Sequence, residues 1–128
     1  MSRRDLKKDS YYDALNESLI NVEKTINLLR RLEDNRLNID ESIVLKDISK
    51  TILDLELNLA SMCILLRKMS ENKFIELPTD LRRDMNSIIH SNRFDYDEDI
   101  IVYSQKGREE VNLNDLIMFC KDVLVNDK

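Results

Sequence analysis

Apolar residues recur three and four positions apart along the first part of the chain, from Ser10 to Leu32. This spacing places them on one side of an amphipathic helix. The positions in the stripe are Tyr12, Leu15, Leu19, Val22, Ile26 and Leu29, with Tyr11 and Leu28 widening it. The pattern lasts little more than two heptads, which favours packing inside a helical bundle over a dedicated coiled coil. A polar connection at residues 34–38 interrupts it.

A second helix is predicted from Asn38 or Asp40 to about Met69, and it is apolar on two sides. The main stripe contains Val44, Ile48, Ile52, Leu55, Leu59, Met62, Leu66 and Met69. The second set contains Leu45, Leu53, Leu57, Ala60 and Ile64. A helix that is apolar on more than one side is covered by its own bundle or by a second subunit. We therefore expect a homodimer.

A third, shorter helix is predicted to begin at Pro78 or Thr79. Proline fits the first turn of a helix, and threonine can cap a free backbone N–H. Asp80 then favours the positive end of the helix dipole. The residues of the apolar side are Leu81, Met85, Ile88 and, at its edge, Ile89.

The opposite side of this helix carries Arg83, Asn86 and His90. Arg83 and His90 are seven positions apart, so they lie about 20° out of register and roughly 10 Å apart along the helix axis. His90 is the only histidine in the chain. Because the apolar side points elsewhere, His90 is predicted to face water, a ligand or another chain.

The stretch after this helix changes character. Residues 93–99 are polar and acidic and have no helical period, whereas residues 100–103 are β-branched and aromatic. A turn at 105–108 and a return at 110–111 predict a small hairpin, with Gly107 where positive φ costs little. Asn112 can then cap a last helix that ends at about Val125. Val111 and Leu116 have the spacing of a hydrophobic staple around that start.

Composition agrees with a helical protein. The 128 residues are 42% hydrophobic and 35% charged, with one glycine and one proline. This length is expected to form a single domain over residues 1–128. Short connections between amphipathic helices favour antiparallel neighbours. The predicted fold is therefore all-α, a four-helix up-and-down bundle with a small β-hairpin-like insertion before the last helix.

The net charge of −5 and the pI of about 5.0 argue against a protein that coats nucleic acid nonspecifically. The first eight residues are basic but lack the apolar segment of a signal peptide. No apolar run approaches the roughly 20 residues that cross a bilayer. We expect a soluble, cytoplasmic protein that does not enter a membrane.

Metal and cofactor chemistry has little material in this sequence. Cys63 and Cys120 lie in predicted helices, with no Cys or His nearby at metal-ligand spacing. They are expected to be buried small hydrophobes. A glycine-rich phosphate loop, a GxSxG motif and a paired-cysteine motif are also missing from the sequence. No metal and no cofactor are expected.

The stretch Arg83-Asp84-Met85-Asn86-Ser87-Ile88-Ile89-His90, on the third helix of a small bundle, resembles the HEPN superfamily of prokaryotic toxin and defence proteins. The family motif is an arginine, four to six residues and a histidine, commonly with a polar residue after the arginine. Six residues intervene here, at the long limit of that range, and Asp84 follows the arginine. The segments at 94–103 and 113–116 also resemble the tails of several HEPN families.

The resemblance implies a metal-independent endoribonuclease that acts as a homodimer on an RNA substrate. In that case His90 transfers the proton, Arg83 clamps the phosphate, and Asp84 or Asn86 orients one of them. It further implies a role in a toxin–antitoxin or phage-defence system, with an antitoxin or another defence protein as partner.

Two other functions remain open. The chain could be a non-catalytic helical interaction module whose protein partner covers Arg83, Asn86 and His90. It could also bind a nucleotide or another small anion at Arg82, Arg83 and Arg93. An arginine and a histidine within eight positions occur in many helices, so the motif alone does not choose among these functions.

Overall fold

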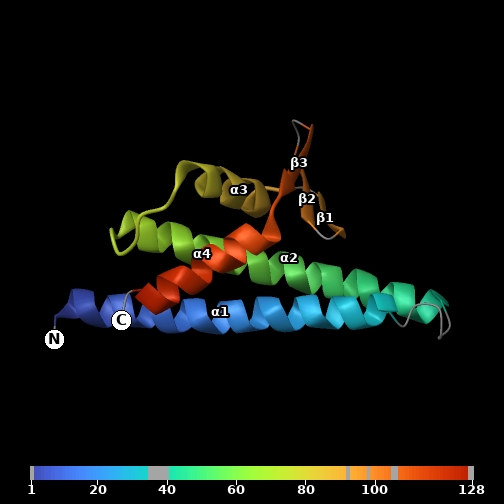
Figure 1. Cartoon of the computed structure of the whole chain (residues 1–128), viewed down its shortest axis with the longest axis horizontal. Helices are drawn as coiled ribbons and strands as arrows, with labels where there is room; N and C mark the ends of the chain where they lie inside the picture. Colours follow the sequence, from blue (N-terminus) through green and yellow to red (C-terminus); the bar gives the residue numbers. More distant parts are fainter. Residues whose placement is uncertain (1, 35–40, 92, 98, 105–106, 127–128) are drawn as a thin grey trace.

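The computed structural model describes residues 2–34, 41–91, 93–97, 99–104 and 107–126. This described part is mostly helical, with four helices and three short strands, so the predicted helical class is confirmed. In chain order the elements are α1 (Arg3–Asp34), α2 (Glu41–Glu71), α3 (Thr79–Ile89), β1 (Arg93–Asp97), β2 (Asp99–Ser104), β3 (Gly107–Val111) and α4 (Leu113–Asn126). Successive helices run in alternating directions (Figure 1).

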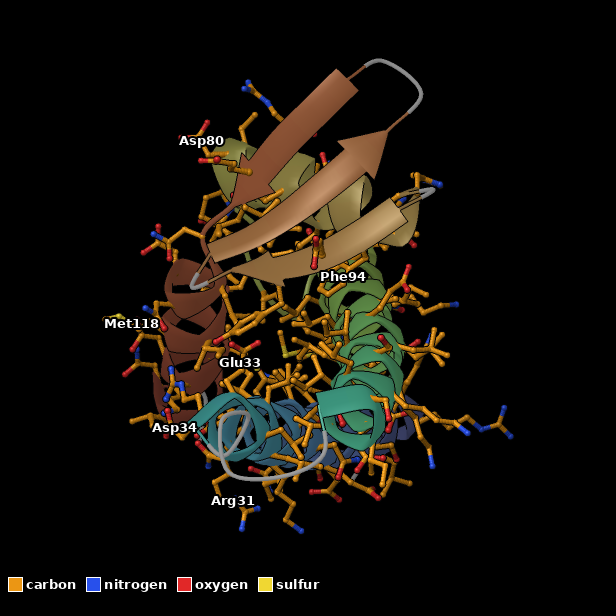
Figure 2. The ribbon with its side chains drawn as sticks, turned by 90° about the vertical axis from the view of Figure 1, so that its right-hand side faces the viewer. Arg31, Glu33, Asp34, Asp80, Phe94 and Met118 are labelled. Carbon is orange, nitrogen blue, oxygen red and sulfur yellow. The ribbon has the colours of Figure 1, made fainter. Side chains whose placement is uncertain are left out.

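The long antiparallel pair α1 and α2 is the base on which the rest of the chain packs. The shorter α3 lies along α2, and α4 crosses α1 (Figure 1). The strands form one antiparallel sheet beyond the end of α3, over the same side of the helical pair (Figure 2). The bundle is therefore uneven, because two short helices and a sheet cover only part of two long helices.

The core follows the predicted main stripes. On α1 it takes Leu15, Leu19, Val22, Ile26 and Leu29, and on α2 it takes Val44, Ile48, Leu55, Leu59, Met62, Leu66 and Met69. Leu28, which was predicted to widen the α1 stripe, is 40% exposed, so that detail is wrong. The described residues leave most of the second apolar set on α2 uncovered: Leu45, Leu53, Leu57 and Ile64 are exposed, and Ala60 is half-buried.

The helix α1 begins at Arg3 rather than at Ser10, because contacts with the end of α2 hold its first turns. The Arg4 guanidinium donates a hydrogen bond of 3.0 Å to the Asn72 carbonyl and lies 4.8 Å from the Phe74 ring centroid. Lys7 donates from Nζ to the Asn72 side-chain oxygen at 2.9 Å. These residues carry no apolar period, so sequence periodicity missed them.

A turn after α2 directs the chain into α3. Lys73 adopts a left-handed φ of 62°, and the Phe74 N–H donates to the Met69 carbonyl at 2.9 Å. This is the Schellman arrangement of a helix end, and the buried Phe74 packs against the core as its apolar contact. At the start of α3, Pro78 stands at the cap position without a side-chain hydrogen bond, so the predicted threonine cap is wrong.

The predicted hairpin is confirmed by the antiparallel pairing of β2 with β3, in which Ile100 faces Val111. The sequence did not predict β1, which pairs antiparallel with β2 and makes the sheet three-stranded. Phe94 and Tyr96 of β1 are half-buried against the core while Asp95 is exposed, a period of two over a very short stretch. The predicted turn at 105–108 lies partly outside the described residues.

The start of α4 agrees with its prediction. The Asn112 side-chain oxygen accepts a hydrogen bond of 3.1 Å from the Asp115 N–H. Val111 and Leu116 are both buried, as the staple requires.

Candidate functional site

The helix α3 has one buried and one exposed side, and of the predicted site residues Asp84 and Asn86 are half-buried, Asn86 more so than predicted. Met85 and Ile88 are fully buried. Arg83 and His90 are both exposed. Its neighbours are α2 and the sheet, which lie on the buried side. The structure therefore confirms that His90 is not a core histidine.

The spacing between Arg83 and His90 survives the end of the helix. The last helical residue is Ile89, and His90 caps the helix with φ −101° and ψ 9°. Its backbone N–H still donates to the Asn86 carbonyl at 3.0 Å, which is the next helical hydrogen bond in the series. Arg83 and His90 consequently stay about two turns apart on the same side, roughly 10 Å along the axis.

A shallow hollow lies between α3 and β3. Its lining residues are Thr79, Arg82, Arg83, Asn86, Ser87 and Glu109, and His90 is not among them. Arg82 donates from Nη2 to the Ser70 hydroxyl at 3.2 Å, which ties it to α2. The Arg83 side chain makes no hydrogen bond or ion pair within the described part of the chain. Arg83 is thus the guanidinium that is available to an anion.

Asp84 lies half-buried on the flank of α3. Burial raises the pKa of its carboxyl, the nearby Arg83 charge partly opposes this, and Asp80, Asp115 and Glu109 raise it further. Asp84 forms no ion pair with Arg83 among the described residues. The guanidinium is therefore not neutralised by its sequence neighbour.

Asn86 and Ser87 supply the polar groups beside Arg83. The Asn86 side-chain oxygen is buried and has no hydrogen-bond partner in the described part of the structure. Ser87 donates its hydroxyl to the Glu109 carboxylate and also approaches the Arg83 carbonyl at 3.2 Å. Ser87 and Glu109 were not predicted as site residues, because they are 22 positions apart and meet only through the register of β3.

The described part of the chain contains no cluster suited to a metal ion. Its His, Cys, Asp and Glu side chains form no group of three that could hold a metal ion. Cys63 and Cys120 are both buried and unpaired, as predicted. Burial raises the pKa of each thiol to about 12. No helix among the described residues combines the length and the apolar character needed to cross a bilayer.

Comparisons with family models, with curated proteins and with solved structures give no significant match for this chain. The likeness to the HEPN superfamily therefore depends on the Arg83–His90 stretch and on the order of the helices.

Proposed function

We propose that this protein is a metal-independent endoribonuclease of the HEPN type, which acts as a cytoplasmic homodimer in a toxin–antitoxin or phage-defence system. One observation carries the proposal. Arg83 and His90 are both exposed on one side of α3, at the spacing of about two helical turns. An antitoxin or another defence protein would inhibit the enzyme by covering this side.

The chemistry needs one proton acceptor and one fixed positive charge. The RNA 2′-oxygen forms a bond to the adjacent phosphorus, the bond from phosphorus to the 5′-oxygen breaks, and a proton moves from the first oxygen to the second. His90 takes and returns that proton, because imidazole titrates near neutral pH. Arg83 binds the phosphate oxygens as negative charge accumulates on them. The products are a 2′,3′-cyclic phosphate and a 5′-hydroxyl.

The polar neighbours have supporting roles in this proposal. Asn86 orients Arg83, since this residue lines the same hollow and its buried side-chain oxygen has no hydrogen-bond partner in the described structure. Asp84, the other supporting residue, acts through its charge, because it is half-buried and forms no described ion pair with Arg83.

The test is cleavage of a mixed RNA pool in EDTA by the wild type, Arg83→Ala and His90→Ala. Each substitution is expected to lower the rate about 10²- to 10⁴-fold. The matched control is Arg31→Ala, which removes the same charge from the exposed end of α1, far from α3 (Figure 2). Wild-type protein that leaves RNA intact, or a His90→Ala variant of full activity, would contradict the proposal.

One observation favours a second function. The hollow beside α3 brings Arg82 and Arg83 together without His90, as a non-catalytic module that binds a nucleotide or the phosphate of another ligand requires. In this alternative the same surface binds a nucleotide or a protein partner and performs no chemistry. Nucleotide binding that is lost in Arg82→Ala and Arg83→Ala but kept in His90→Ala, with RNA uncleaved, would support it.

A further inference from the structure

The side of α2 that faces away from the core is apolar. We call Leu53, Leu57, Ala60 and Ile64 the outer stripe. Leu53 is 51% exposed, Leu57 60% and Ile64 41%, and Ala60 between them is half-buried. The spacing of four, three and four residues is that of a heptad seam.

The outer stripe lies roughly opposite the buried stripe of the same helix, as the period of about 100° per residue requires. The elements with the most extensive contacts to α2 are α1, α3 and β1, and Ile64 borders a hollow between α1 and α2. Figure 2, which looks along the helical pair, shows α2 at the right-hand edge with no element beyond it. This seam has no partner within the described chain.

We propose that the outer stripe binds a second copy of this chain, with the two α2 helices packed antiparallel about a twofold axis. The stripe is self-complementary in this direction. Leu57 then faces Ala60 of the partner subunit, and Leu53 faces Ile64 of the partner subunit. Large residues oppose smaller or β-branched ones, which suits close helix packing. The twofold axis crosses α2 midway along the helix between Leu57 and Ala60.

The charges that flank the stripe select the antiparallel direction. Lys46 comes beside Glu71 of the partner subunit, and the twofold axis makes this pair twice. One like-charged pair, Lys50 with Arg67, opposes them. In a parallel, in-register pair the seam positions face their own copies, so Lys46 would meet Lys46 and Glu71 would meet Glu71 of the partner subunit.

The size of the contact indicates its strength. Pairing from Lys46 to Glu71 is about 38 Å long at 1.5 Å per residue, and a helix with side chains is about 10 Å wide. The footprint is therefore on the order of 400 Å² per copy, half of the roughly 800 Å² of a standard interface. An interface of this size is typical of weak, reversible contacts, so we expect a dissociation constant of about 1 µM or weaker.

This pairing also places α3, a step that rests on the proposed function. Arg82 lies beside Ser70, and α3 runs back along α2, so His90 comes beside about residue 62 of α2. The axis of an antiparallel pair is perpendicular to the plane of the two helices. Both α3 helices therefore lie on one side of the dimer, and their His90 ends point toward the axis. One RNA strand could then contact both copies.

The first experiment is sedimentation velocity over roughly 1 to 300 µM protein, a range that includes the expected affinity. The wild type is expected to dimerise, and Leu57→Asp is expected to weaken the dimer at least about tenfold, because it buries an unpaired charge. The matched control is Met118→Asp, at a 63% exposed apolar residue that points away from the core on α4 (Figure 2). A wild type that stays monomeric, or a Leu57→Asp variant that dimerises like the control, would overturn the proposal.

The second experiment tests the direction by disulfide cross-linking. Lys46→Cys and Glu71→Cys are expected to form a covalent dimer when mixed and to form none when each is oxidised alone. Ala60→Cys, close to the axis, is expected to cross-link with itself. Self-linking of Glu71→Cys at the rate of Ala60→Cys would show a parallel pair and overturn the antiparallel arrangement. Neither experiment uses RNA, so the interface stands or fails separately from the nuclease.

Discussion

The helices α2 and α3 each have one exposed side in the described chain, and the two exposed sides differ in chemistry. On α2 the exposed side presents Leu53, Leu57 and Ile64. On α3 it presents Arg83 and His90. Both helices bury an apolar stripe on their other side, so their inner faces are alike.

The difference separates two uses of exposed surface. Apolar side chains in water cost free energy that only a contact excluding water recovers, which makes the outer side of α2 suited to helix packing. Charged and titratable side chains keep their hydration, which makes the outer side of α3 suited to an anion or a proton. The fold holds these two surfaces on neighbouring helices, joined by the hydrogen bond from Arg82 to Ser70.

The largest expected effect compares the two apolar sides of α2. Leu59→Ala, at a fully buried position, should lower the free energy of unfolding by about 3 kcal/mol. Leu57→Ala, at a 60% exposed position, should change it by less than about 0.5 kcal/mol in dilute protein. Urea denaturation at protein concentrations well below the dimer dissociation constant measures both unfolding free energies. Equal losses would mean that the outer stripe is covered within the monomer.

The buried thiols give a second effect, which depends on pH. The folded state holds the pKa of Cys63 and Cys120 at about 12, whereas the unfolded value is 9.0. Above pH 9 the unfolded chain releases these protons first, so stability is lost progressively up to about pH 12. Between pH 8 and pH 10 each thiol should contribute a loss on the order of 1 kcal/mol.

The control for this effect is the double variant Cys63→Ala and Cys120→Ala, which retains every other titrating group. Its loss of stability over the same interval should be smaller than that of the wild type. If urea denaturation gave the same decrease of the unfolding free energy with pH for the variant and the wild type, the thiols would not be protected. A thiol reagent should likewise label Ala60→Cys far faster than the native Cys63, three positions along the same helix.

The smallest expected effect concerns Asp84. Because its pKa is raised in the folded state, the ionised carboxylate destabilises the fold at neutral pH, and this cost disappears when the group is protonated. Asp84→Asn should therefore raise the free energy of unfolding by a few tenths of a kcal/mol at pH 7, after allowance for solvent screening. Below about pH 3 it should leave this free energy unchanged. Denaturation at both pH values measures this, and a variant less stable than wild type at pH 7 would contradict it.

Periodicity predicted the four helices, because each buries a stripe that repeats every three or four residues. It missed the first turns of α1, which polar contacts from Arg4 and Lys7 hold in place. It also missed β1, where the alternation of Phe94 and Tyr96 with aspartates covers too few residues to stand out. Both segments were missed for the same reason. Their structure depends on contacts with another segment of the chain, the end of α2 in one case and β2 in the other.

The candidate site was predictable where it lies on one helix. The spacing of Arg83 and His90 follows from helical geometry, so their shared exposed side could be anticipated. The participation of Glu109 could not, because the register of β2 with β3 brings it to Ser87. The second apolar set on α2 was visible in the sequence, but only coordinates show that the chain itself leaves Leu53, Leu57 and Ile64 exposed.

The most direct measurement of the whole account is the rate of RNA cleavage per chain, in EDTA, across the concentrations over which the protein dimerises. If dimerisation through α2 is needed for cleavage at α3, the rate per chain rises in step with the dimer fraction. Leu57→Asp then remains folded but loses RNA cleavage. A rate per chain that is constant over this range, or is retained by a monomeric Leu57→Asp, would contradict the account.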